Sequence, residues 1–219
     1  MSHPVRSLRG VVPALVSKAV DDLLGLLLPT PCVACQSLDG PLCGRCRADL
    51  RPAPSAAPPP GVDWWVAAFA YEGPIREAIV RAKYRDQRAV LSWLARRLAD
   101  LCPHDVDVVT WVPASTIRRR ARGVDHAELI ARHLGRRCDL PVRRLLVRSA
   151  GLPQTGRTAR ERRAGPKLRC EYALGPYSVL VVDDVATTGG SAMAAARALR
   201  CAGADSVGFA SVARTAPHE

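Results

Sequence analysis

The sequence is poor in aromatic residues and has no long uninterrupted apolar run, and each shortage excludes a class of protein. Aromatic residues make up 5% of the 219 residues, too few for an extended platform on which nucleic-acid bases stack. The longest apolar stretch, residues 11–28, contains Lys18, Asp21 and Asp22, so it falls short of the roughly 18 uncharged residues of a membrane span. It also lacks the small-x-small cleavage site of a secretory signal. We therefore expect a cytoplasmic protein without a membrane span.

Two common nucleotide-binding fingerprints are missing as well. The chain contains neither the GxxxxGK[ST] pattern of P-loop proteins nor the GxGxxG pattern of dinucleotide-binding βαβ units. Both absences argue against a P-loop nucleoside triphosphatase and a Rossmann dehydrogenase. The chain is also short of acidic residues, with 20 Asp and Glu against 32 Lys and Arg and a formal charge of +12. This balance favours a polyanionic or phosphorylated partner.

The positive charge is concentrated in one part of the chain. Residues 116–170 hold 16 Lys and Arg but 4 Asp and Glu, so they carry the whole formal charge of +12. This segregation predicts one basic surface or loop, and a solvated arginine-rich helix face is the alternative. We consider the following arginines as ligands of a pyrophosphate group or of a nucleic-acid backbone: Arg118, Arg119, Arg120, Arg122, Arg160, Arg162 and Arg163.

The hydrophobic pattern predicts an α/β protein in two parts. Apolar residues at helical spacing predict a helix over 11–28, and a four-cysteine segment follows it. The Pro-rich stretch after it disfavours both helix and central strand, so we expect an N-terminal module at 1–51, a linker at 52–61 and a larger domain at 62–219. Strands alternate with helices in this domain, which predicts a mainly parallel sheet flanked by helices. The expected strands are 64–71, 107–112, 178–182 and 206–212, and the expected helical regions are 74–101, 125–134 and 191–202.

Four of the eight cysteines form two Cys-x-x-Cys pairs, Cys32 with Cys35 and Cys43 with Cys46. The two-residue spacing lets each pair present two thiolates to one tetrahedral zinc ion. A disulfide scaffold would need export from the cell, and a thioredoxin-like site would use a single pair after a strand. Because four sulfurs fill the coordination shell, we predict a structural rather than a catalytic zinc.

The most specific pattern is an apolar strand, two carboxylates and a Thr/Gly turn that opens a helix. At the carboxyl end of a parallel strand, this order of residues forms a ligand crevice. Asp183 and Asp184 can accept hydrogen bonds from vicinal sugar hydroxyls or help to hold a divalent cation through water. The free amides of the turn and the positive end of the helix suit a phosphate monoester. The predicted phosphate ligands are Thr187, Thr188, Gly189, Gly190 and Ser191.

Residues 180–191, LVVDDVATTGGS, resemble the 5-phosphoribosyl-1-pyrophosphate (PRPP) motif of type I phosphoribosyltransferases. The wider arrangement is similar to the ComF family, competence-associated proteins with a zinc knuckle before a phosphoribosyltransferase-like domain. Besides the four cysteines, the likeness is carried by Tyr71-Glu72-Gly73-Pro74 with Lys83-Tyr84, Val112-Pro113 with Arg119-Arg120-Ala121-Arg122-Gly123, and Gln154-Thr155 with Arg160-Glu161-Arg162-Arg163.

The resemblance implies a type I phosphoribosyltransferase-like parallel sheet flanked by helices, with a small N-terminal four-cysteine zinc knuckle. It implies that Asp183 and Asp184 are the catalytic carboxylates that bind the ribose hydroxyls, that residues 187–191 hold the 5-phosphate and that Mg²⁺ accompanies PRPP. The sequence departs from the pattern twice. Thr187 stands where many active transferases have an acidic residue, and Val124-Asp125-His126 stands where the family has Phe-Asn-Gln.

Two functions follow from these patterns. The first is a PRPP-binding, phosphoribosyltransferase-like protein that transfers phosphoribose to an acceptor that the sequence does not name. The second, implied by the ComF resemblance, is a single-stranded DNA-binding adaptor in DNA uptake with DNA-uptake proteins as partners. In that case the basic segment neutralises backbone phosphates, and the PRPP site is a sensor or a relic.

Overall fold

The computed structural model describes residues 31–82, 88–103, 105–115, 125–148 and 165–216. The helix expected over 11–28 and the seven candidate arginines between residues 118 and 163 lie outside these ranges. Among the helices that are described, none combines the length and the apolar character that crossing a membrane requires.

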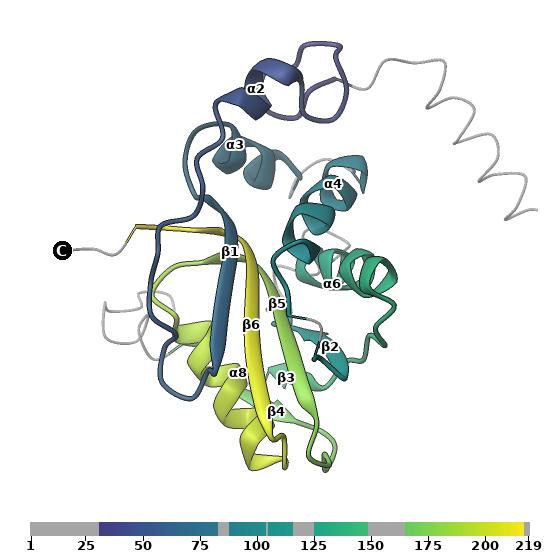
Figure 1. Ribbon diagram of the computed structural model, residues 1–219, viewed down its shortest axis with the longest axis vertical. Coiled ribbons are helices and arrows are strands. Elements are labelled where there is room, and N and C mark those ends of the chain that lie inside the picture. Colours follow the sequence, from purple (N-terminus) through teal and green to yellow (C-terminus); the bar gives the residue numbers. More distant parts are fainter. Residues whose placement is uncertain (1–30, 83–87, 104, 116–124, 149–164, 217–219) are drawn as a thin grey trace, which may run out of the picture.

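A four-stranded, fully parallel sheet forms the centre of the molecule (Figure 1). Its strands lie in the order β1-β6-β5-β2, so β6 and β5 occupy the middle. Because the strands are parallel, all four carboxyl ends meet at one edge of the sheet. The prediction of an α/β fold with a parallel sheet is confirmed. The bounds are β1 (Trp64–Ala70), β2 (Val108–Trp111), β5 (Ser178–Ala186) and β6 (Ser206–Arg214).

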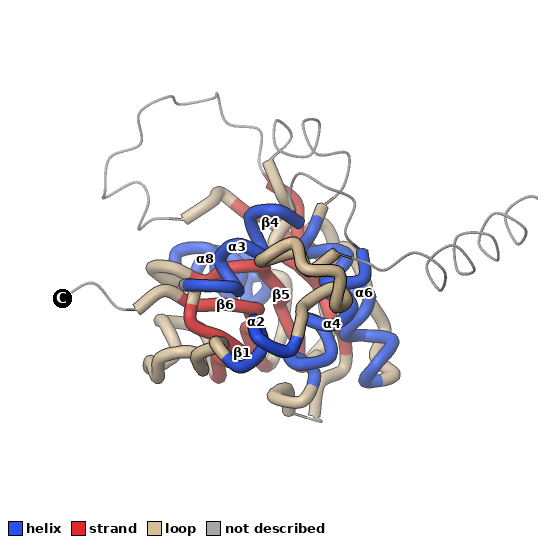
Figure 2. Tube along the Cα trace, turned by 90° about the horizontal axis from the view of Figure 1, so that it is seen from above, coloured by secondary structure: helices blue, strands red, loops and turns tan. Residues whose placement is uncertain are grey.

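Helices cover both faces of this sheet, as Figures 1 and 2 show. Leu180 and Val182 of β5 pack in one apolar cluster with α3 (Gly73–Ala82), α4 (Arg88–Ala99) and α6 (His126–Cys138). Val179 and Val181 pack in a second cluster with α8 (Gly190–Cys201). All four of these β5 side chains are fully buried. A short antiparallel ribbon, β3 (Leu146–Arg148) and β4 (Leu168–Cys170), adds to the α8 side.

The two central strands are longer than the sequence predicts. Their ladder continues from the pair Val182 and Ala210 to the pair Ala186 and Arg214. Both aspartates therefore lie inside β5, not after it, because backbone pairing with β6 prolongs the strand through these polar residues. The expected helical region 74–101 consists of α3 and α4, and α6 extends to Cys138.

The four-cysteine segment shares its core with the large domain. Cys32 and Val33 are fully buried in the same apolar cluster as residues of α3. Arg81 of α3 donates Nη1 to the carbonyls of Val33, at 3.1 Å, and Ala34, at 2.7 Å. The segment, which includes the short helix α2 (Gly44–Ala48), is thus fastened to α3.

The Pro-rich segment 52–61 lies against the sheet. Pro52 forms an antiparallel bridge with Phe69 of β1, and the Pro54 carbonyl accepts a hydrogen bond from Arg214 Nη2 of β6. Further along, Pro59 lies beside Gly189, where a Cβ atom would be 3.2 Å from the Pro59 Cβ. The segment therefore runs past the carboxyl ends of two strands and the start of α8.

Candidate functional site

Asp183 and Asp184 are half-buried near the carboxyl end of β5. The Asp184 amide donates to Asp183 Oδ1 at 2.8 Å. Because successive side chains of a strand point to opposite faces, Asp183 continues the face of Val181, toward α8. Asp184 continues the face of Val182. The two carboxylates therefore reach different sides of the strand end.

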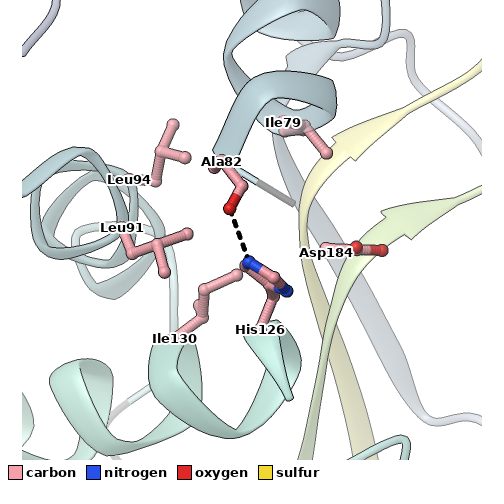
Figure 3. A pocket seen from close by; sticks show the side chains of 7 residues that line it. All are labelled: Ile79, Ala82, Leu91, Leu94, His126, Ile130 and Asp184. Atoms are coloured by element: carbon pink, nitrogen blue, oxygen red, sulfur yellow. Dashed lines mark hydrogen bonds between the residues drawn. The ribbon is translucent and has the colours of Figure 1, made fainter. Parts of the chain in front are cut away.

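Asp184 borders a small cavity between the sheet and the helices, shown in Figure 3. Its volume of about 10 Å³ has room for one water molecule at most. Buried His126 lines it, and its Nε2 lies 2.7 Å from the Ala82 carbonyl. Since a carbonyl oxygen can only accept, Nε2 carries the proton. His126 thus ties the start of α6 to the end of α3. The other lining residues are Ile79, Ala82, Leu91, Leu94 and Ile130.

The turn after β5 presents backbone amides at the start of α8. Thr187 and Thr188 are exposed, and Gly189 has a φ of 77°, a left-handed conformation that favours glycine. Gly189 is the N-cap of the 12-residue helix, and because glycine has no side chain it provides no side-chain cap for these first amides. Such uncapped amides, together with the helix dipole, suit an anion. Ser191 is half-buried in the first turn.

The described residues that flank both arginine-rich segments lie at the same edge of the sheet. Ala114 precedes residues 116–124 and Asp125 follows them, and the Ala114 amide donates to Asp125 Oδ2 at 2.7 Å. Before residues 149–164, Arg148 Nε donates to the Pro113 carbonyl at 2.6 Å. After them, Gly165 sits so close to α8 that an added Cβ would lie 2.1 Å from the Gly190 carbonyl oxygen. The sequence-predicted arginines themselves fall outside the described residues.

A second cavity, of about 90 Å³, lies beside the end of β2. Asp125, which is 9% exposed, forms part of its wall. Burial raises the pKa of Asp125, and the hydrogen bond from the Ala114 amide opposes this shift. The remaining lining residues are Trp111, Pro113, Ala114, Glu128, Arg144, Val147 and Arg148.

The four cysteines of the two Cys-x-x-Cys pairs converge, as the spacing predicts. All four sulfur atoms lie within 4.8 Å of one another, and Cys35 Sγ is 3.6 Å from Cys43 Sγ. A tetrahedral zinc ion with Zn–S distances of about 2.3 Å holds its sulfurs roughly 3.8 Å apart. The Cys43 amide also lies 3.4 Å from Cys32 Sγ, a backbone hydrogen bond that suits a thiolate ligand. The donor set and its spacing therefore fit zinc.

The charges of this cluster also favour a cation. The hydrogen bond with Ser37 lowers the pKa of Cys35, while burial and the neighbouring sulfurs raise the pKa of Cys46. Four thiolates this close repel one another, so they coexist only around a positive ion. With every position taken by sulfur, such an ion has no open site for catalysis.

Arg214, the last residue of β6, lies beside the candidate site and was not singled out by the sequence. It is 6% exposed, and its guanidinium carbon lies 4.9 Å from the centre of the Trp65 ring. Its backbone is paired with Ala186, the residue directly before Thr187. The sequence signal, an arginine at the end of an apolar strand, is also typical of an ordinary solvent-exposed strand end.

No protein-family model and no curated protein sequence matches this chain. Among solved structures it is similar to an allosteric regulatory enzyme of purine biosynthesis (23% identity, TM-score 0.41), over 57% of this chain and 26% of that one. It is also similar to the hypoxanthine phosphoribosyl transferase of Trypanosoma cruzi, with 14% identity and a TM-score of 0.35 over 60% of this chain and 74% of that one. A third similar structure is the purine phosphoribosyltransferase from Pyrococcus horikoshii, with 16% identity and a TM-score of 0.31 over 59% of this chain and 81% of that one. This chain thus spans about a quarter of the length of the first. At this level of similarity, function has to be inferred from the chain's own residues.

Proposed function

We propose that this chain is a PRPP-binding protein of the type I phosphoribosyltransferase kind, resembling the ComF family. The observation that carries the proposal is the uncapped start of α8, which follows a glycine turn directly after a buried parallel strand with two carboxylates. Amides 190–192 would hold the 5-phosphate, with the Thr187, Thr188 and Ser191 hydroxyls as further donors. Asp183 and Asp184 would accept hydrogen bonds from the ribose hydroxyls.

The same arrangement suits transfer of the phosphoribosyl group. When bound, Mg²⁺ neutralises charge on the pyrophosphate, and Asp183 or Asp184 can help to hold it through water. Arginines of the two basic segments would bind the leaving group, because Ala114, Arg148 and Gly165 bring the chain to this edge on either side of them. Thr187 offers no carboxylate to activate an acceptor, so the acceptor class is left open.

The test is isothermal titration with PRPP in the presence and absence of Mg²⁺. The wild-type protein should bind PRPP, and the double variant Asp183→Asn with Asp184→Asn should fold normally but lose detectable binding. A hydrogen bond to a charged group contributes on the order of 1.5–3 kcal/mol, so losing two lowers affinity at least a hundredfold. Asp139→Asn with Asp205→Asn, which removes the same charge from residues away from this turn, is the matched control.

The outcomes separate the parts of this proposal. A wild-type protein that binds no PRPP under either condition contradicts the function. If the double variant binds as the wild type does, the assignment of the aspartates to the ribose is wrong. If it fails to fold while the control folds, the pair is structural.

A second candidate function, a single-stranded DNA-binding adaptor in DNA uptake, is supported by the concentration of the whole formal charge in residues 116–170. Phosphate contacts from arginines would hold a strand in register without reading its bases. In that case the same two basic segments would bind a nucleic-acid backbone in place of a pyrophosphate group.

A further inference from the structure

Arg214 carries a buried positive charge that no described residue neutralises. Its Nη2 donates to the Pro54 carbonyl, but its buried Nε and Nη1 have no hydrogen-bond partner in the part of the chain that the structure describes. None of the ion pairs between described residues includes it. A guanidinium cannot shed its proton, so burial cannot neutralise it as it neutralises a lysine. A buried charge with unpaired N–H groups is strongly unfavourable, which indicates a missing acceptor.

Arg214 is connected to the start of α8 through its backbone neighbours and through the Trp65 ring. Its backbone neighbour across the ladder is Ala186, and the Thr215 amide donates to the Ala186 carbonyl at 3.1 Å. The guanidinium stacks on the ring of Trp65, and the edge of the same ring lies 3.5 Å from where a Cβ of Gly189 would be. One indole ring thus contacts both Arg214 and the N-cap of the helix.

Among the described residues, two further buried groups near this end of the sheet have no hydrogen-bond partner, and both can donate. They are Trp65 Nε1, which can only donate, and Ser211 Oγ, a hydroxyl on the residue paired with Asp183. Together with the two N–H groups of Arg214, they form a set that is rich in donors and has no carboxylate among the described partners. A ligand that is negatively charged and rich in acceptor oxygens would satisfy such a set.

We propose that Arg214 is a phosphate ligand, whose Nε–H and the second N–H of the neighbouring Nη2 bind two oxygens of the anion held at the start of α8. The proposal rests on the proposed function for the position of that phosphate. The planar fork of a guanidinium matches two oxygens of a tetrahedral oxyanion, and the uncapped helix amides take the others. Because Pro54 and Trp65 cover the guanidinium, segment 52–61 must shift to admit the anion and then shields it from water.

The experiment compares inorganic phosphate and PRPP as ligands of the wild-type protein and three variants. Arg214→Gln removes the charge, Arg214→Lys keeps the charge but not the fork, and Arg197→Gln removes the same charge from the exposed side of α8. Thermal unfolding with increasing phosphate gives one readout, and isothermal titration with PRPP and Mg²⁺ gives the other.

We expect phosphate to raise the unfolding temperature of the wild type and of Arg197→Gln. For Arg214→Gln, phosphate and PRPP should bind at least tenfold more weakly, and Arg214→Lys should be intermediate. Without ligand, Arg214→Gln should unfold no earlier than the wild type, because it removes an uncompensated buried charge. A purely structural arginine gives the opposite pair of results: a lower unfolding temperature and an unchanged response to phosphate.

The remaining outcomes also support or overturn the assignment of Arg214 as a phosphate ligand. Equal phosphate response in Arg214→Gln and Arg197→Gln overturns the inference, and so does a wild type that phosphate does not stabilise. Arg214-dependent phosphate binding without PRPP binding supports the inference and contradicts the proposed function. If neither Arg214 variant folds, a crystal structure of the wild type with phosphate decides: an anion that does not contact Arg214 overturns the inference.

Discussion

Asp125 and His126 occupy two positions of the Phe-Asn-Gln pattern from which this sequence departs, and both make hydrogen bonds within the fold. Asp125 Oδ2 accepts from the Ala114 amide, and His126 Nε2 donates to the Ala82 carbonyl. An asparagine oxygen can accept in the same way, and a glutamine amide can donate in the same way. Asp125 and His126 thus make hydrogen bonds that an asparagine and a glutamine could also make at these positions, and Asp125 adds a buried carboxylate.

This carboxylate should make stability depend on pH. Because burial raises the pKa of Asp125 in the folded protein, the folded state holds the proton more tightly than the unfolded state does. The resulting stabilisation is present below the ordinary pKa of 3.8 and is lost as pH rises through the folded-state pKa. Asp125→Asn keeps an acceptor for Ala114 but does not titrate. Urea unfolding should show the wild type losing stability relative to the variant as pH rises above about 4.

The control for this prediction is Asp205→Asn, an exposed aspartate whose replacement should leave the pH profile parallel to that of the wild type. A constant difference in unfolding free energy between wild type and Asp125→Asn across this pH range contradicts a shifted pKa of the Asp125 carboxyl.

For single residues, the sequence could indicate which side chains carry chemistry but not which groups they contact. Arg214 is the clearest case, because its burial depends on Trp65 and Pro54, both far from it in sequence.

Among the elements, β5, α8 and β6 were predictable because an unbroken apolar run, a Gly-Gly pair and a second apolar run follow one another. Their ends were not, since Asp disfavours strands by itself and only the ladder to β6 extends β5 to Ala186. The ribbon of β3 and β4 escaped prediction for a different reason. Each strand has three residues in an arginine-rich stretch, too short for an alternating pattern.

The four-cysteine segment should contain one zinc ion per chain. A knuckle this short has too little apolar surface to fold unaided, so metal binding and folding are coupled. Metal analysis of protein purified without added zinc should give a stoichiometry near one, and a chelator should lower the unfolding temperature. Cys46→Ser should lose the metal, while Cys201→Ser, an exposed cysteine outside the cluster, should keep it.

Loss of zinc should also destabilise α3, which lies outside the four-cysteine segment. Cys32 and Val33 share an apolar cluster with α3, and Arg81 is bonded to two knuckle carbonyls. We therefore expect the chelated protein to show faster amide exchange in α3 than in α8. Metal content near zero in reduced, folded protein contradicts the zinc assignment.

For the whole molecule, the segregated charge predicts a salt-sensitive affinity for single-stranded DNA. Each neutralised phosphate contributes about −0.7 to the slope of log affinity against log salt, so several arginines should give roughly −3 or steeper. Replacing Arg118, Arg119, Arg120 and Arg122 by Gln should flatten the slope and weaken binding to all sequences alike. Fluorescence anisotropy with unrelated oligonucleotides across a salt series measures both effects.

The control variant replaces four exposed arginines outside the basic segment, Arg45, Arg51, Arg76 and Arg97. If both quadruple variants lose affinity equally, net charge and not the basic segment is responsible. No binding to oligonucleotides at low salt, together with Mg²⁺-dependent binding of PRPP, assigns the arginines to the pyrophosphate and rejects the adaptor.

The position of β6 has a consequence for biosynthesis. This strand follows all the other described strands in the chain, yet it lies between β1 and β5 and is the sheet partner of both. The Val207 amide donates to Asp63 Oδ2 across 144 residues of sequence. Until residues 206–214 leave the ribosome, β1 therefore lacks its partner strand, and β5 is paired with β2 on one side but has an open edge on the other. Such open edges invite aggregation, so slow translation or truncation before residue 206 should make this protein depend on chaperones.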